Sequence, residues 1–72
     1  MNPDVMRGIE AYLKKVMNPG VSVQARPRVT DSVEVISAGE HVGVVYVIED
    51  EGETSYQLQM TILQEDLDDM QA

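Results

Sequence analysis

The spacing of hydrophobic residues changes twice along the chain, and each spacing predicts a different element. Over 1–17 it matches an amphipathic helix, with apolar residues at Val5, Ile9, Tyr12, Leu13 and Val16. Asn2-Pro3-Asp4 suits the start of this helix, because Asn is a good N-cap and Pro fits the first helical position. Asn18-Pro19-Gly20 is a typical helix end.

Between 21 and 63 four runs of β-forming residues alternate with turn formers, which predicts an antiparallel meander in the order 1-2-3-4. The turns predict its register. Gly39-Glu40 suits a two-residue loop, and Asp50-Glu51-Gly52 suits a three-residue loop with a bulge. Together these loops predict one buried sheet face, which carries Val33, Val35, Val44, Tyr46, Leu58 and Met60.

The last segment, 64–72, is acidic. Leu63, directly before it, and Leu67 and Met70 within it recur at helical spacing. This pattern suits either a short helix or a partly disordered tail. The predicted fold class is therefore α+β in a single domain, 1–72. An N-terminal helix (1–17) packs on a four-stranded antiparallel meander (21–63), followed by a short acidic C-terminal segment (64–72).

In this register the sheet face away from the helix carries Ile36, Val45, Val47, Gln57 and Gln59. Three arrangements remain open for it: contact with a second copy or another protein, cover by the C-terminal segment, or exposure to solvent. We expect the first, so these five residues are the candidate interaction surface. Val45→Glu should then weaken association and leave the chain folded. The edge of the fourth strand offers another route, by extending the sheet across a two-fold axis.

Length and composition favour such association. A chain of 72 residues buries only about 60% of its unfolded surface, so it needs support. With no cysteine and one histidine, His41, the chain has no disulfide and is a poor candidate for structural zinc. It shows neither a secretory signal nor an apolar run of about 20 residues. We expect a cytoplasmic protein without a membrane partner.

Charge is divided unevenly along the chain. Residues 1–28 hold all five basic residues and have a net charge of +3, whereas the rest holds eleven acidic residues, giving −8 in total. A strongly acidic chain is a poor partner for nucleic acid, whose binding depends on clustered Lys and Arg. The division favours a protein partner, or self-association that matches unlike charges.

No group of residues typical of catalysis is present: the chain lacks a cysteine nucleophile and a phosphate-binding glycine motif, and His41 lies beside a tight hairpin. We therefore expect a non-enzymatic interaction module that forms a homodimer and has no catalytic, cofactor-binding or metal-binding residues. The alternative is a small ligand- or cation-binding regulator that uses the acidic hairpin tip, where the predicted register sets Glu49 opposite Glu53. The ligand spacing of a calcium loop is missing there.

Several short motifs are shared with one family: Asn2-Pro3-Asp4, Arg26-Pro27, Asp31-Ser32-Val33-Glu34-Val35, Gly43-Val44-Val45, Asp50-Glu51-Gly52-Glu53 and Gln59-Met60-Thr61-Ile62-Leu63. Through them the chain resembles a family of short alphaproteobacterial proteins known only as a domain of unknown function. The likeness extends over nearly the whole chain. It implies a bacterial cytoplasmic protein that stands alone, and it transfers no activity and no site residues.

Overall fold

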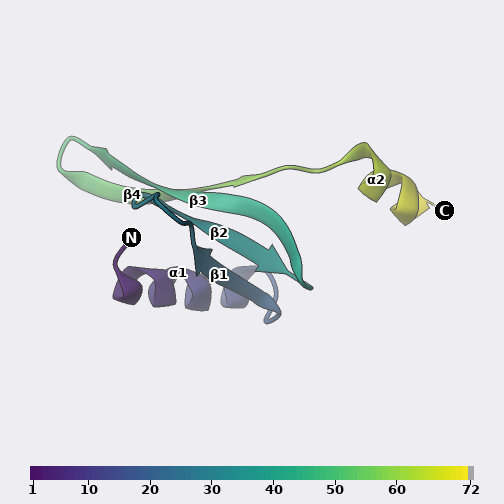
Figure 1. The fold of residues 1–72 in the computed structure, drawn as a ribbon, viewed down its shortest axis with the longest axis horizontal. Coiled ribbons are helices and arrows are strands. Elements are labelled where there is room, and N and C mark those ends of the chain that lie inside the picture. Colours follow the sequence, from purple (N-terminus) through teal and green to yellow (C-terminus); the bar gives the residue numbers. More distant parts are fainter. Residues whose placement is uncertain (72) are drawn as a thin grey trace.

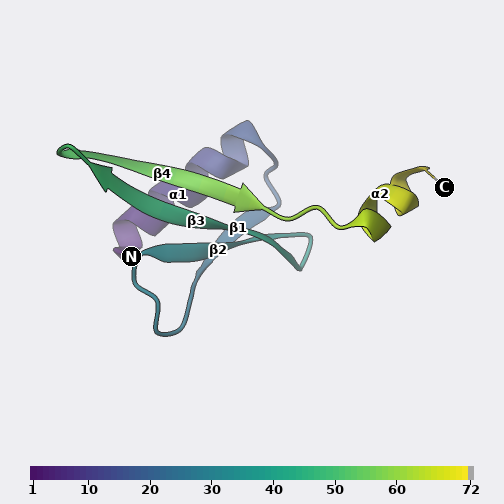
Figure 2. The ribbon, with the colours of Figure 1, turned by 90° about the horizontal axis from the view of Figure 1, so that it is seen from above.

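The computed structural model describes residues 1–71 and confirms the predicted α+β fold class (Figures 1 and 2). Its elements are α1 (Pro3–Val16), β1 (Val21–Ala25), β2 (Ser32–Ser37), β3 (Glu40–Asp50), β4 (Glu53–Met60) and α2 (Gln64–Gln71). The strands form one antiparallel sheet in the order β1-β2-β3-β4. The acidic segment 64–72 forms α2 as far as Gln71, and Ala72 lies outside the described residues.

Helix α1 begins where the sequence predicts. The side chain of Asn2 caps it, since Oδ1 accepts a hydrogen bond from the backbone N–H of Asp4 at 2.7 Å. Pro3 takes the first turn, where its missing N–H costs nothing. Lys14 and Lys15 lie in the last turn, next to the negative end of the helix dipole. Local signals alone therefore fix the position of this helix.

Removing the cap should destabilise the chain. Asn2→Ala leaves the N–H of Asp4 without its acceptor, and we expect a loss of about 1 kcal/mol in the free energy of unfolding. Urea denaturation followed by circular dichroism measures this loss. Asn2→Ser keeps an acceptor oxygen and should retain most of the stability, so an equal loss in both variants would contradict the capping role.

The core lies between α1 and one face of the sheet. Its buried side chains come from one position on the helix and four on the strands: Leu13, Val21, Val33, Val35 and Val45. Met6, Ile9, Val23, Val42 and Leu58 pack around them, half-buried. Ser32 is buried beside this core and accepts a hydrogen bond from Arg26 Nη1 at 2.9 Å. The helix packs on the sheet, as predicted, but β3 and β4 present a different face to it.

The first hairpin corrects the predicted register. Its two-residue loop is Ala38-Gly39 rather than Gly39-Glu40, with φ angles of 54° and 79°. Such a turn, left-handed at both positions, matches the right-handed twist of paired strands, and this fit outweighs the cost of Ala in that conformation. A bulge follows: Val35 pairs with Gly43 but Ile36 pairs with His41, so that Val42 is an extra residue on β3.

The second hairpin corrects it again. Its loop is Glu51-Gly52, with φ angles of 51° and 81°, so Asp50 pairs with Glu53 in place of the predicted three-residue loop. This shorter loop sets polar Gln57 opposite Tyr46, which the three-residue loop would have avoided. The structure contains that very pair, on the face away from the helix. There both side chains reach solvent, and the pairing costs nothing.

The buried face is consequently exchanged on the outer two strands. Val45 is 3% exposed and pairs with half-buried Leu58 on the helix side, whereas Val44 pairs with Gln59 on the far side. The predicted core positions Val44 and Tyr46 were therefore wrong, while Val33, Val35 and Leu58 were right. The bulge explains the exchange, because it allows Val42 and Val45, which differ in parity, both to pack on the core.

Candidate functional site

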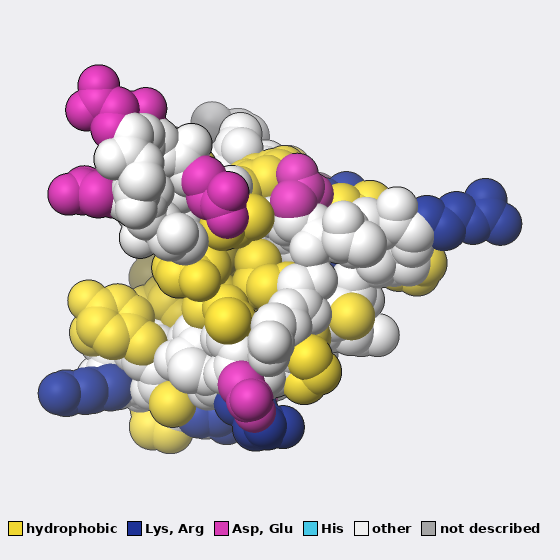
Figure 3. Space-filling view, turned by 90° about the vertical axis from the view of Figure 1, so that its left-hand side faces the viewer, with side chains coloured by type: hydrophobic (Ala, Val, Ile, Leu, Met, Phe, Trp, Pro, Cys, Tyr) yellow, Lys and Arg dark blue, Asp and Glu magenta, His cyan; other side chains and the backbone are white. Residues whose placement is uncertain are grey.

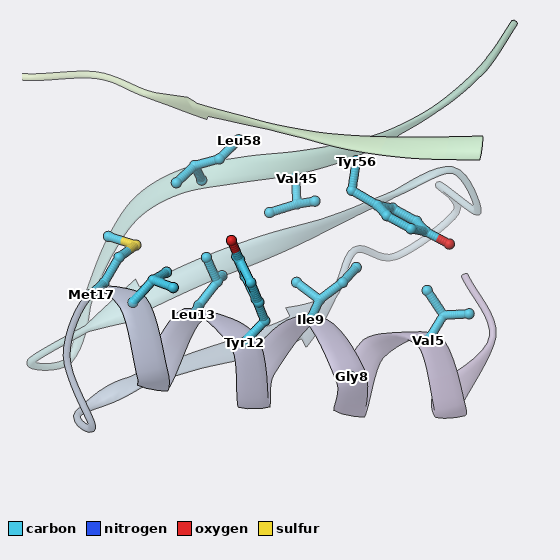
Figure 4. A pocket seen from close by; sticks show the side chains of 10 residues that line it. Val5, Gly8, Ile9, Tyr12, Leu13, Met17, Val45, Tyr56 and Leu58 are labelled. Carbon is cyan, nitrogen blue, oxygen red and sulfur yellow. The ribbon is translucent and has the colours of Figure 1, made fainter. Parts of the chain in front are cut away.

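One helix is too narrow to cover this sheet. Neighbouring strands lie about 4.8 Å apart and a helix is about 10 Å across, so one helix covers about two strands. Helix α1 packs most closely on β1 and leaves the side of β3 and β4 that faces it partly open (Figure 1). The result is a groove between α1 and the outer half of the sheet (Figure 4).

The groove has a volume of about 650 Å³ and an almost wholly apolar lining. One side of it, called the floor, is formed by apolar residues of α1, and the opposite side is formed by residues of β3 and β4. Met17 and Leu58 lie at one end, while Val5 and Tyr56 lie at the other (Figure 4). The Tyr12 side chain stands in the middle and points its hydroxyl toward the sheet. The remaining lining residues are Gly8, Ile9, Leu13, Val16 and Val45.

The groove lining is unusually exposed for side chains of its kind. Tyr12 is 64% exposed, Val16 53% and Tyr56 44%. Figure 3 shows hydrophobic side chains gathered across the middle of one end of the molecule, mainly between acidic side chains above and basic ones below. An open apolar surface of this kind, bounded by charged residues, is typical of a site where another protein packs.

Charge differs between the two ends of the groove. Lys15 follows Tyr12 by three residues on α1, so it flanks the floor near the Val16 end. Among the described residues Lys15 makes no ion pair, whereas Lys14 lies 4.0 Å from Glu10. The acidic turn between β3 and β4 lies beyond Tyr56, at the opposite end. An acidic partner would therefore be attracted to the end of the groove near Lys15.

The structure divides the predicted interaction surface between two faces. Val45 lies in the core, and Val47 pairs with Tyr56 on the helix side. Ile36, Gln57 and Gln59 lie on the far side of the sheet. The five residues do not form one surface. Sequence analysis placed Tyr12 in the apolar stripe of a helix that packs on the sheet. Comparing the width of one helix with that of four strands would have shown that part of this apolar surface must remain uncovered.

The far side of the sheet carries a shallow depression of about 300 Å³ around His41. His41 Nδ1 lies 2.8 Å from Glu34 Oε2, across the β2–β3 pair. Tyr46 and Gln59 lie beside them. A solvent-accessible contact of this kind contributes little to stability. The depression also holds the hydroxyls of Tyr46 and Thr61, but among the described residues no hydrogen bond joins His41 to either, so His41 is not placed to activate a nucleophile.

The acidic hairpin tip gains no support as a cation site. In the observed register Glu49 pairs with Thr54, and Asp50 pairs with Glu53, so the predicted opposition of Glu49 and Glu53 was wrong. Within residues 1–71, no three acidic or histidine side chains lie close enough together to hold a metal ion. The tip is a solvated turn with both loop residues in left-handed conformation.

Helix α2 stands clear of both α1 and the sheet, beyond the end of β4 (Figures 1 and 2). Its apolar side chains are exposed; Met70 is 85% accessible to solvent. Gln64 Nε2 donates to Asp68 Oδ1 at 3.0 Å along its polar side. The molecule thus presents two unpartnered apolar surfaces, the groove and the apolar side of α2.

Comparison with known proteins identifies a family and no activity. A family model described as "Protein of unknown function (DUF3126)" matches residues 6–66. Neither the curated proteins nor the solved structures contain a match. Over the part of the chain that the structure describes, neither helix is long and apolar enough to cross a membrane.

Proposed function

We propose that this chain, which belongs to the DUF3126 family of unknown function, is a non-enzymatic protein-interaction module that forms a homodimer through its groove. The observation that carries the proposal is the partly uncovered outer half of the sheet, where Leu58 and Tyr56 face α1 across an open apolar space. A groove of that width and lining accepts an amphipathic helix in many protein complexes.

Size and charge support a protein as the partner. A domain of 72 residues has little core, and covering the groove would add apolar burial where the chain lacks it. The net charge of −8 disfavours nucleic acid. A chain without cysteine suits the reducing cytoplasm, where we place the protein.

A charge placed in the groove tests the proposal. Tyr12→Asp puts a carboxylate where a partner would pack, and because Tyr12 is exposed, the fold should survive. We expect the dissociation constant of the dimer to rise at least tenfold, or about 1.4 kcal/mol. Size-exclusion chromatography with light scattering over a range of concentrations measures it, and circular dichroism checks the fold.

Ala11→Asp is the matched control. It makes the same charge change one position earlier on α1, about 100° around the helix and outside the groove. Its dimer should dissociate like that of the unmodified chain. An unmodified chain that stays monomeric at every concentration would refute the homodimer. Equal behaviour of the two variants would refute the groove as its interface.

A further inference from the structure

We propose that the groove of each chain receives α2 of a second copy, so that two chains exchange their C-terminal helices around a two-fold axis. The inference rests on the proposed function and names the segment that fills the groove. Exchange of this kind gives two identical contacts in one closed dimer. Four features of the chain support it: the pattern of α2, its length, the segment before it, and its charge.

The pattern of α2 matches an occupant of a groove. Leu63, Leu67 and Met70 recur at i, i+4 and i+7, within about 60° of arc at 100° per residue. This is the spacing by which helices anchor in apolar grooves. All four acidic residues of the segment lie outside the arc: Glu65, Asp66, Asp68 and Asp69. An isolated helix of eight residues is marginal in water, so α2 needs a surface on which to pack.

The lengths agree. From Leu63 to Met70 the stripe extends about 10 Å, at 1.5 Å per residue. The floor of the groove, from Val5 to Val16, extends about 16 Å on the same measure. Beside α1, a second helix would cover the part of the sheet formed by β3 and β4. The two helices together would then span all four strands.

The segment before α2 favours a second copy over the same chain. Thr61 and Ile62 continue the line of β4, and the molecule is 47 Å long against 25 and 22 Å across (Figure 1). To enter its own groove, α2 would have to reverse direction within Thr61–Ile62–Leu63. This segment contains no Gly, Pro, Asn or Asp, and two of its residues are β-branched, which favours extended backbone. Because the segment before it is extended, α2 can reach another chain without rearrangement.

Charge is complementary at one end of the groove. Helix α2 carries four acidic residues, while Lys15 flanks the groove at its Val16 end. The acidic β3–β4 turn would repel α2 from the other end. Asp66 lies about 40° from Met70 on the helix, at the margin of the stripe, where it can approach Lys15 of the second copy.

A complementation experiment tests the exchange. Leu67→Asp puts a charge in the apolar stripe of α2 and keeps the groove intact. Tyr12→Asp puts a charge in the groove and keeps α2 intact. Each variant alone should dissociate at least tenfold more readily than the unmodified chain. An equimolar mixture should form a heterodimer of intermediate affinity, because one intact α2 meets one intact groove. Sedimentation velocity on the single variants and the mixture gives the order, and a mixture no stronger than its components overturns the exchange.

A spin label distinguishes exchange from closure within one chain. The chain has no cysteine, so Asp69→Cys introduces a unique and exposed site for a nitroxide on the polar side of α2, outside the apolar stripe. Labelled chain without ¹⁵N is mixed with ¹⁵N-labelled unmodified chain, so that broadening reports contacts between chains only. We expect it at the amides of Tyr12 and Val16, which line the groove. A second sample carries the nitroxide and ¹⁵N on the same chain. If broadening occurs in that sample but not in the mixture, α2 packs within its own chain, and the proposal is overturned.

The two variants also separate this inference from the proposed function. If Tyr12→Asp weakens the dimer and Leu67→Asp does not, the groove is an interface, but α2 is not its occupant. That result overturns the exchange and leaves the proposed function standing. If neither variant weakens the dimer, both fall.

Discussion

Replacing Val45 by a charged residue, Glu or Lys, is expected to unfold the chain. Val45 is 3% exposed and packs beside Val33 and Leu58 in the core. The change forfeits about 1.5–3 kcal/mol of apolar burial and forces an unpaired charge into the core at a cost of several kcal/mol more. A chain of 72 residues has about 4–11 kcal/mol in total. Circular dichroism and amide nuclear magnetic resonance dispersion should both show an unfolded chain.

Val44→Lys is the control, because Val44 neighbours Val45 but lies on the far side of the sheet. There it faces Glu34 and Gln59 across the neighbouring strands, so a lysine gains an acidic neighbour. This variant should remain folded. The register predicted from sequence requires the reverse, with Val44 buried and Val45 exposed. A folded Val45→Lys together with an unfolded Val44→Lys would therefore restore that register and move the groove to the other face.

The limits of α1 and the order of the strands could be predicted because the signals are local. Asn2-Pro3-Asp4 starts α1 through its own side chain and backbone, and Asn18-Pro19-Gly20 ends it with Asn18 Oδ1 accepting from the N–H of Gly20 at 2.7 Å. Neither signal depends on what packs against the helix. The four strands likewise lie between clear turn formers, which is sufficient for a meander.

The register could not be predicted, because β3 is apolar on both faces. Val42, Val44, Val45 and Tyr46 include both parities, so alternation does not say which side is buried. The register is then set by the turns. One residue more or less in a loop moves every side chain of the following strand to the opposite face of the sheet. Both loops adopt left-handed pairs that include a non-glycine residue, Ala38 or Glu51. In both loops the match to strand twist outweighed the preference of a non-glycine residue for negative φ, and no local sequence pattern predicts this.

The predicted interaction surface is divided between two faces for a related reason. All five predicted residues were chosen by their face, and the exchanged register moved Val45 and Val47 to the helix side. The apolar pattern of Leu63, Leu67 and Met70 was visible in the sequence. The groove was not visible, because it arises only from the position of α1 over β1, which depends on the packing of the whole sheet.

Gly43→Ala is expected to destabilise the chain by about 3 kcal/mol, as overpacking of a tight site does. A Cβ at this position would lie 2.6 Å from the backbone oxygen of Gln59 and 3.1 Å from Met60 Cγ. The Met60 side chain can move aside, but the Gln59 oxygen belongs to β4, so the strand itself must shift. Urea denaturation measures the loss, and hydrogen exchange should show the amides of β4 opening first.

Gly8→Ala provides the contrast, because a Cβ at Gly8 meets no atom within 4 Å. Gly8 lies inside α1, where Ala is favoured over Gly by about 1 kcal/mol, so this variant should gain stability. The same methyl group thus stabilises at one glycine and destabilises at the other. If Gly43→Ala were as stable as the unmodified chain, β4 would not approach β3 so closely there, and the bulge that brings both Val42 and Val45 to the core would be in doubt.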